Sequence, residues 1–379
     1  MKGKNGLYYA WMALLGMAVI AGLITAFKLF TEGHGLFNAN DVLIWTLPLG
    51  VYLFLALTSS GLTLLAAIPL VLGIREYEPF AKRMVFLAIA TLAGAFTAIG
   101  LELGSAHHMF YIMLSPNFSS PIWWMGAIYS LELIALLLKL WRMHVGDWHS
   151  TLSRFLGIVS FALALVAPLM IGSVFGLTES RATYFGPVMS IYCLTGAFLS
   201  GVALFLLYSI VLQKITGNSA SEEHVALYDK LALLFAYAIG LVVIFTLLRT
   251  IMESATTIPD FLYYYEFKHA LGAWQGFHIE VVLGLYLPFI LMLISSVRKT
   301  IAGKMVTSTL VLAGIMSMYM ESLIVGQSRP VGPKAEHYPQ FISYFPSIWE
   351  WLVFIFALAV LLLLYTMGER YLRLAEAPE

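Results

Sequence analysis

Long apolar stretches alternate with short polar segments along the whole chain. Ten of these stretches hold about 19 residues or more, which at about 1.5 Å per helical residue crosses a hydrocarbon core of about 30 Å. They lie near residues 8–27, 43–72, 84–103, 122–140, 155–177, 185–212, 231–252, 273–297, 305–325 and 348–367. The pattern predicts an all-α polytopic membrane protein with ten transmembrane helices.

The basic residues fall mainly between alternate stretches. With the N-terminus placed inside, 15 of the 21 Lys and Arg residues lie on inner segments and six on outer ones. The outer six are Lys28, Arg181, Arg249, Lys268, Arg329 and Lys334. Because Lys and Arg are enriched on the cytoplasmic side of membrane proteins, this distribution predicts cytoplasmic N and C termini and a bacterial inner membrane location.

Composition excludes several classes of protein. A chain with 60% hydrophobic and 11% charged residues is too apolar for a soluble domain of this length. Its single cysteine, Cys193, cannot hold an iron–sulfur cluster or close an intrachain disulfide. The first stretch lacks a small-residue cleavage site before Lys28, so we expect a retained span. We therefore expect a single integral membrane domain over residues 1–379.

Two of the predicted spans contain a faint repeat. Tyr52 precedes Gly61 by the interval at which Tyr192 precedes Gly201, and a serine stands before each glycine. The match continues to the pairs Glu102 with Glu253 and Glu132 with Glu280. Four spans separate the two copies, so both would have the same orientation in the membrane.

The repeat predicts two four-helix bundles, which we call the first and second units. The first unit comprises spans two to five (residues 43–177) and the second comprises spans six to nine (residues 185–325). The two are expected to be related as a parallel repeat about an axis along the membrane normal. Spans one and ten, in residues 1–42 and 326–379, would flank them.

Ionisable residues gather in the outer halves of the predicted spans. Charged side chains at membrane depth are costly and usually face a protein interior or an aqueous cavity. Glu132 and Glu280 are expected inside their spans, whereas Glu102 and Glu350 lie close enough to span ends to be helix-terminal residues at the headgroup level. Six of the nine histidines are also on the outer side. Any chemistry is therefore expected near the outer face.

Haem and metal sites are disfavoured by the positions of the histidines. Transmembrane haem needs axial histidines that face each other inside neighbouring spans, and only His278 lies clearly inside a span. His107 and His108 do not form a metal pair, because adjacent helical residues point in different directions. We expect no haem, no iron–sulfur cluster and no metal in this chain.

Without such cofactors, electrons cannot cross the membrane through this chain. Redox chemistry would then begin and end on one side, which suits a lipid-soluble two-electron carrier. A quinone headgroup needs hydrogen-bonding groups at two carbonyls, a proton acceptor and an apolar path for its tail. Outer-leaflet His, Tyr and Glu side chains between helices provide that set.

Several runs resemble the NrfD/PsrC family, the membrane subunits of polysulfide-reductase-type complexes. They are the run from Pro48 to Gly61, Leu101–Gly104, the Pro-Asn-Phe-Ser-Ser-Pro run from Pro116 to Pro121, Gly326–Gln327, and the run from Tyr344 to Glu350. The last two are similar to the ten-span branch of the family. The likeness covers residues 35 to 370.

The resemblance implies a quinone-binding subunit without haem. It also implies two kinds of partner: a four-cluster iron–sulfur subunit, and a molybdopterin or multihaem-cytochrome catalytic subunit. The chain departs from the family pattern in three places. Glu102 stands where Asp is usual, Ser105-Ala106 where Arg-Pro is common, and Glu321 where the ten-span branch often has Arg.

We predict a quinone site near the outer face of the first unit, for menaquinone or ubiquinone. His34, Glu102, His107 and Tyr129 are expected around the headgroup, with Glu102 as the catalytic proton acceptor. Glu132, His278 and Glu280 are candidates for a proton relay. Two alternatives remain open: a secondary transporter built from two parallel repeats, and a purely structural membrane anchor.

Overall fold

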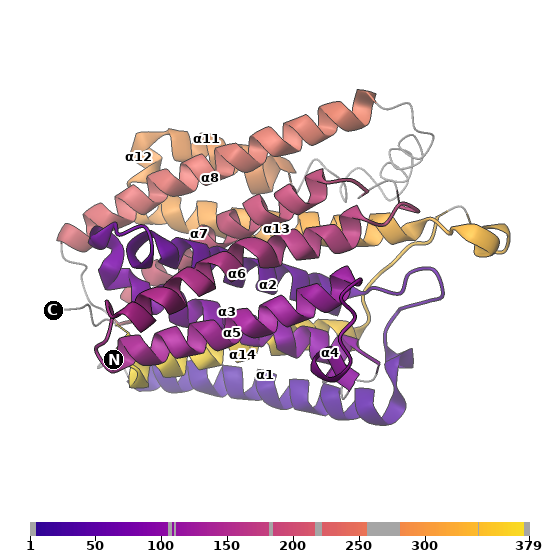
Figure 1. The fold of residues 1–379 in the computed structure, drawn as a ribbon, viewed down its shortest axis with the longest axis horizontal. Coiled ribbons are helices and arrows are strands. Elements are labelled where there is room, and N and C mark those ends of the chain that lie inside the picture. Colours follow the sequence, from indigo (N-terminus) through magenta and orange to yellow (C-terminus); the bar gives the residue numbers. More distant parts are fainter. Residues whose placement is uncertain are drawn as a thin grey trace.

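The computed structural model describes residues 5–104, 108–109, 111–181, 185–216, 222–255, 281–339 and 341–374. Within these ranges the chain is helical, and its long helices run side by side in a layered bundle (Figure 1). Nine of the described helices are long and apolar enough to cross a membrane. They are α1 (Asn5–Glu32), α2 (Leu47–Leu70), α3 (Glu78–Glu102), α5 (Pro121–His144), α6 (Thr151–Gly176), α7 (Val188–Thr216), α8 (Glu222–Ala255), α13 (Ile301–Ser328) and α14 (Ile348–Tyr371).

The predicted eighth span, residues 273–297, begins outside the described residues. Its described part consists of a π-helical turn, η4 (Val282–Tyr286), followed by α11 (Leu287–Leu293) and α12 (Ser295–Arg298). The remaining short elements are η1 (His34–Leu36), η2 (Arg75–Tyr77), α4 (Tyr111–Leu114) and η5 (Gly332–Glu336). The all-helical membrane architecture is confirmed. The total of ten spans stays a prediction, because the eighth is described only in part.

Several helices begin at a residue that caps them. The side chains of Ser120, Ser150 and Thr300 accept hydrogen bonds from the first backbone N–H groups of α5, α6 and α13. Ser347 forms a reciprocal capping box with Glu350 at the start of α14. These side chains satisfy N–H groups that have no partner within their own helix.

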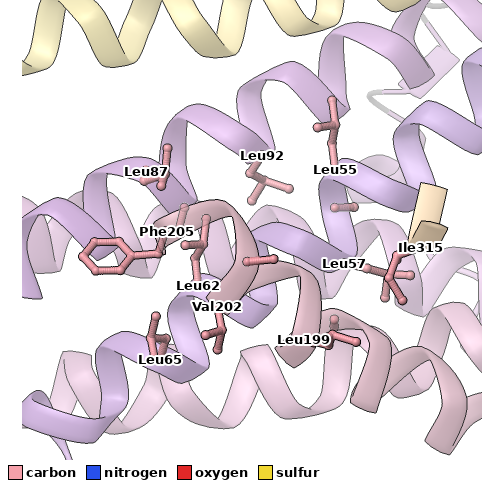
Figure 2. Close-up of a cluster of buried hydrophobic side chains, with 14 of the residues drawn as sticks. Leu55, Leu57, Leu62, Leu65, Leu87, Leu92, Leu199, Val202, Phe205 and Ile315 are labelled. Atoms are coloured by element: carbon pink, nitrogen blue, oxygen red, sulfur yellow. The ribbon is translucent and has the colours of Figure 1, made fainter. Parts of the chain in front are cut away.

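Helix α2 is the centre of the molecule. Of the residues in its most apolar stretch, 89% are buried, against 17% for α1. It packs against α3, α6, α7, α13 and α14. Figure 2 shows this core, in which leucines of α2 meet side chains of α3, α7 and α13. A membrane helix buried on every side can carry polar groups that lipid would not tolerate.

The helices of each predicted unit contact one another in a ring. In the first unit, α2 contacts α3, α3 contacts α5, α5 contacts α6 and α6 contacts α2. In the second unit, α7, α8, the η4–α11 segment and α13 contact one another in the same cyclic order. Helix α14 packs against α3, and α1 packs against α14 (Figure 1). The division into units and their relation as a parallel repeat stay predictions.

The start of α1 and the end of α14 lie at the same end of the bundle. Trp11 Nε1 donates to Thr366 Oγ1 at 3.1 Å, and the Arg370 guanidinium lies 4.8 Å from the Tyr8 ring. This agrees with termini on one side of the membrane, and the assignment of that side to the cytoplasm stays a prediction.

The two units meet where α2 crosses α7. A Cβ atom on Gly61 would lie 1.8 Å from the carbonyl oxygen of Ala197, and one on Gly201 would lie 2.3 Å from the carbonyl carbon of Gly61. Beside this crossing, the hydroxyls of Thr58 and Ser200 are 2.9 Å apart. Gly61 and Gly201 are equivalent positions in the sequence repeat, and each contacts the other, as at a two-fold interface. Small residues permit this close approach.

Replacing Gly61 with alanine should force α2 and α7 apart. The new methyl group would meet backbone rather than a flexible side chain, so we expect the free energy of unfolding to fall by about 2 kcal/mol or more. Thermal unfolding in detergent measures this change. Gly100→Ala is the matched control, because a Cβ atom on Gly100 meets nothing within 4 Å. Equal unfolding temperatures for the two variants would contradict the prediction.

Candidate functional site

The end of α2 that is predicted to face outward is surrounded by buried and half-buried polar side chains. We call this group, which consists of His34, Thr46, Glu102, Gln327, Tyr344 and Glu350, the outer cluster. It forms around the non-helical segment 44–46 and Leu47, the first residue of α2. Where lipid or packed side chains exclude water, the N–H and C=O groups of non-helical backbone must find hydrogen-bond partners within the protein.

Gln327, near the end of α13, satisfies the first part of this segment. Its Oε1 accepts hydrogen bonds from the backbone N–H groups of Ile44 and Trp45 at 3.1 and 2.9 Å. Its Nε2 donates to the carbonyl oxygen of Trp45 at 3.1 Å and to that of Leu323 at 3.1 Å. One amide group therefore joins the two units at the outer face.

Glu102, the last residue of α3, satisfies the next position. Its Oε1 accepts from the Thr46 backbone N–H at 3.0 Å, and the Thr46 hydroxyl lies 3.1 and 2.9 Å from its two oxygens. The predicted proton acceptor thus also holds the start of α2.

His34 lies beside Glu102, as the sequence suggested. Its Nε2 donates to the carbonyl oxygen of Leu101 at 2.9 Å. Because a carbonyl oxygen can only accept, Nε2 carries the proton and Nδ1 is the remaining polar atom of the ring. The ring also packs edge-on against Phe37.

Tyr344 and Glu350 complete the outer cluster. The Tyr344 hydroxyl accepts from the Leu47 backbone N–H at 2.8 Å. Burial raises the pKa of the Tyr344 hydroxyl, and the neighbouring carboxyl of Glu350 raises it further. The phenol is therefore neutral at physiological pH and lies close to the carboxyl groups of both Glu350 and Glu102.

A second polar group lies deeper in the first unit. This central cluster consists of Tyr52, Ser60, Tyr129 and Glu132, all of which are buried. The Ser60 hydroxyl donates to Glu132 Oε2 at 3.0 Å, and the rings of Tyr52 and Tyr129 meet edge-on with centroids 6.4 Å apart. Within the described part of the chain, the Tyr129 hydroxyl and Glu132 Oε1 have no hydrogen-bond partner.

Tyr129 therefore belongs with Glu132, three residues later on the same face of α5. Its predicted place with His34 and Glu102 around one headgroup stays a prediction. Tyr52, its ring partner, comes six residues after Thr46, a distance of about 9 Å along a helix. The Tyr52–Tyr129 pair thus lies between the outer cluster and Glu132.

The structure buries three lysines that sequence reasoning did not single out, Lys82, Lys139 and Lys304. Lys139, on α5, is 1% exposed. Its Nζ donates to Ser153 Oγ at 2.7 Å, to the carbonyl oxygen of Ser153 at 3.1 Å and to that of Trp148 at 3.3 Å. Lys139 follows Glu132 by seven residues, or about two helical turns. This spacing places both residues on one face of α5, and it is the sequence signal that could have indicated the burial of Lys139.

Three predicted site residues, His107, His278 and Glu280, lie outside the described residues. Among the residues that the structure does describe, no group of three or more His, Cys, Asp or Glu side chains could hold a metal ion. The expected absence of metal from the whole chain stays a prediction.

The fold and the two clusters define a polytopic membrane protein with an acidic, hydroxyl-rich interior in its first unit. Residues 35–331 match the family described as polysulphide reductase, NrfD. The chain belongs to this family, and the resemblance carried by its sequence motifs is confirmed.

Three curated relatives extend over most of the chain. A putative dimethyl sulfoxide reductase membrane subunit of Halobacterium salinarum is 23% identical, over 84% of this chain and 77% of its own. The Hdr-like menaquinol oxidoreductase integral membrane subunit of Archaeoglobus fulgidus is 21% identical, over 97% and 94%. A selenate reductase subunit of Mesobacillus selenatarsenatis is 20% identical, over 94% and 92%. The chain is thus similar to subunits of reductase complexes.

Replacing Gln327 with methionine should destabilise the outer cluster. The change would leave the backbone N–H groups of Ile44 and Trp45 without their acceptor, and the loss of an acceptor costs about 1–3 kcal/mol for a donor that is shielded from water. We expect the free energy of unfolding in detergent to fall by about 2 kcal/mol or more. Gln327→Glu, which keeps an acceptor oxygen, should lose less. A methionine variant as stable as the unmutated protein would show that Gln327 is not a structural link.

Proposed function

We propose that this chain is the quinone-reactive membrane subunit of a respiratory oxidoreductase complex. It exchanges electrons between the membrane quinone pool and an iron–sulfur partner at the outer face. The observation that carries the proposal is the outer cluster, which gathers an imidazole, carboxyl groups and a phenol at the end of a fully buried helix. Membership of the NrfD family supports a membrane-subunit role.

The names of the relatives support the redox assignment. Each is a subunit of a reductase or oxidoreductase, and the Archaeoglobus fulgidus protein is named for menaquinol. By the family resemblance, the soluble partners are a four-cluster iron–sulfur protein and a molybdopterin or multihaem-cytochrome protein. The complex would lie in the bacterial inner membrane, with these partners on the outer side.

The quinone headgroup would lie between the outer cluster and the Tyr52–Tyr129 pair. A quinone has carbonyl groups on opposite edges of its ring, so it needs polar groups on two sides. Glu102 and His34 provide one side. The Tyr129 hydroxyl, buried and without a partner in the described part of the chain, provides the other. His107 is a further candidate contact on the outer side.

Glu102 is the proposed proton acceptor for quinol. Its position at the outer end of α3 puts the released proton near the outer solution. The hydrogen bonds from Thr46 hold the carboxyl group in one orientation, and a fixed orientation favours proton transfer to a defined substrate oxygen.

Glu132 is the proposed first member of a proton relay. Fully buried within α5, it bonds to Ser60 through one oxygen while the other has no partner in the described residues. An ionised carboxylate is costly at such depth, so a buried Glu serves best as a group that gains and loses a proton. Glu280 and His278 are the proposed counterparts in the second unit.

Glu102→Gln tests the proposed proton acceptor. Glutamine keeps a carbonyl oxygen for the Thr46 N–H but cannot take a proton at neutral pH. We expect quinol-linked turnover of the complex to fall by about 10²-fold or more, with assembly intact. Turnover is followed as quinol oxidation by the purified complex.

Glu32→Gln is the control for this test, because Glu32 is exposed at the same outer face, where it pairs with Lys28. Normal turnover in an assembled Glu102→Gln complex would move the proton acceptor elsewhere. If the unmutated complex neither oxidises quinol nor reduces quinone, and copurifies with no iron–sulfur protein, the transporter alternative is favoured.

Glu132→Gln tests the proposed relay. In proteoliposomes that contain the full complex, we expect the membrane potential generated per quinol oxidised to fall by about tenfold or more, because the amide cannot carry a proton. A voltage-sensitive dye reports the potential. Glu32→Gln should behave as the unmutated complex does. An unchanged potential in Glu132→Gln would leave Glu132 as a structural partner of Ser60.

A further inference from the structure

One face of α5 carries a row of buried side chains, three of them polar, from the central cluster toward the inner end of the helix. The buried residues Tyr129, Glu132, Leu136, Lys139 and Met143 follow one another at intervals of three or four. This spacing keeps them on one helix face. Lys139 is two turns beyond Glu132, or about 10 Å closer to the inner side.

The surroundings of Lys139 differ from those of the buried Lys304. In the described part of the chain, its hydrogen bonds all go to neutral oxygens, those of Ser153 and Trp148. Lys304, by contrast, pairs with Asp229. Keeping an ammonium group charged is costly when it is buried and only neutral atoms receive its hydrogen bonds. Lys139 is therefore suited to release a proton.

Polar atoms of α2 begin beside Glu132 and continue toward the inner end of that helix. Thr63 on α2 lies against Glu132. Pro69, inside α2, has no N–H group, so the buried carbonyl of Leu65 lacks its usual helical donor. Leu65 lies five residues beyond Ser60 toward the inner end of α2. Water held by such groups would connect the two ionisable side chains.

Lys139 also has a polar connection to the inner surface. The Ser150 hydroxyl donates to Asp147 Oδ2 at 2.6 Å and accepts from the Ser153 backbone N–H at 3.2 Å. Ser153 in turn accepts from Lys139 through its hydroxyl. The Asp147 side chain is 22% exposed, so a carboxyl group in contact with solvent stands at the inner end of this series.

We propose that Lys139 is the inner member of the proton path whose middle member is Glu132. A proton leaves Lys139 Nζ, passes through water and arrives on the Glu132 carboxylate. The neutral amine then takes a proton from the inner solution through water at the Asp147 loop, because the backbone N–H that links Ser153 to Ser150 cannot relay one. Glu132 passes its proton toward the outer side before the next cycle, so each cycle moves one proton outward, and the reverse sequence moves one proton inward. This inference rests on the proposed function, because quinone chemistry at the outer side drives the transfer.

Lys139→Arg separates this role from a structural one. Arginine keeps the positive charge and the hydrogen-bond donors that hold α5 to α6, but it cannot be deprotonated in a protein. The full complex is placed in proteoliposomes, and quinol oxidation and membrane potential are recorded together. We expect the potential generated per quinol oxidised to fall by about tenfold or more.

Lys82→Arg is the matched control. Lys82 is also a buried lysine near the inner side of its helix, and it donates to the carbonyl oxygen of Arg373 rather than lying on the row of α5. The complex that carries Lys82→Arg should generate the same membrane potential per quinol oxidised as the unmutated complex. An equal potential in Lys139→Arg and Lys82→Arg would overturn the proposal and leave Lys139 as a link between α5 and α6.

The remaining outcomes also decide the question. If Lys139→Arg does not assemble, Lys139→Gln is measured by the same criterion, and failure of both to assemble assigns the lysine to helix packing. An unmutated complex that oxidises quinol without any potential overturns the relay while the quinone site stands. An unmutated complex without quinol or quinone turnover overturns the proposed function itself.

Discussion

Backbone polar groups that lipid and packed side chains shield from water must find partners within the protein, and the structure depends on how α2 meets this constraint. Most backbone groups of α2 bond within the helix, but its first N–H group and those of the segment that precedes it cannot. Gln327, Glu102 and Tyr344 supply the missing acceptors from three different parts of the chain. The buried position of α2 and the polar character of the outer cluster thus have the same physical origin.

The same helix connects the two polar clusters. Thr46 at its outer end bonds to Glu102, and Ser60 at mid-length bonds to Glu132. Because α2 is surrounded by other helices, these groups are kept away from lipid. At the crossing with α7, Gly61 and Gly201 let the two helix backbones come into close contact, which holds α2 in this central position. Packing and polar chemistry are therefore arranged along a single element.

Much of this arrangement could be predicted from the sequence. Apolar length indicated the spans, and the depth of Glu132 followed from its distance beyond Pro121. The proximity of His34 to Glu102 was also expected, since both lie at outer span ends. The partners could not be predicted, because side-chain direction depends on helix rotation. Tyr129 proved to face Tyr52 and to lie beside Glu132, and Lys139, which counted only as a basic inner residue, proved to be buried.

The bonds around the start of α2 also set the order in which the protein matures. They join residues 44–47 to residues 327 and 344, which are 282 to 297 positions apart in the chain. Residues emerge from the ribosome at about 5–20 per second, so α2 enters the membrane well before these partners exist. The outer cluster forms only after α13 and the segment before α14 have been made. A chain that ends early therefore inserts helices without completing the site.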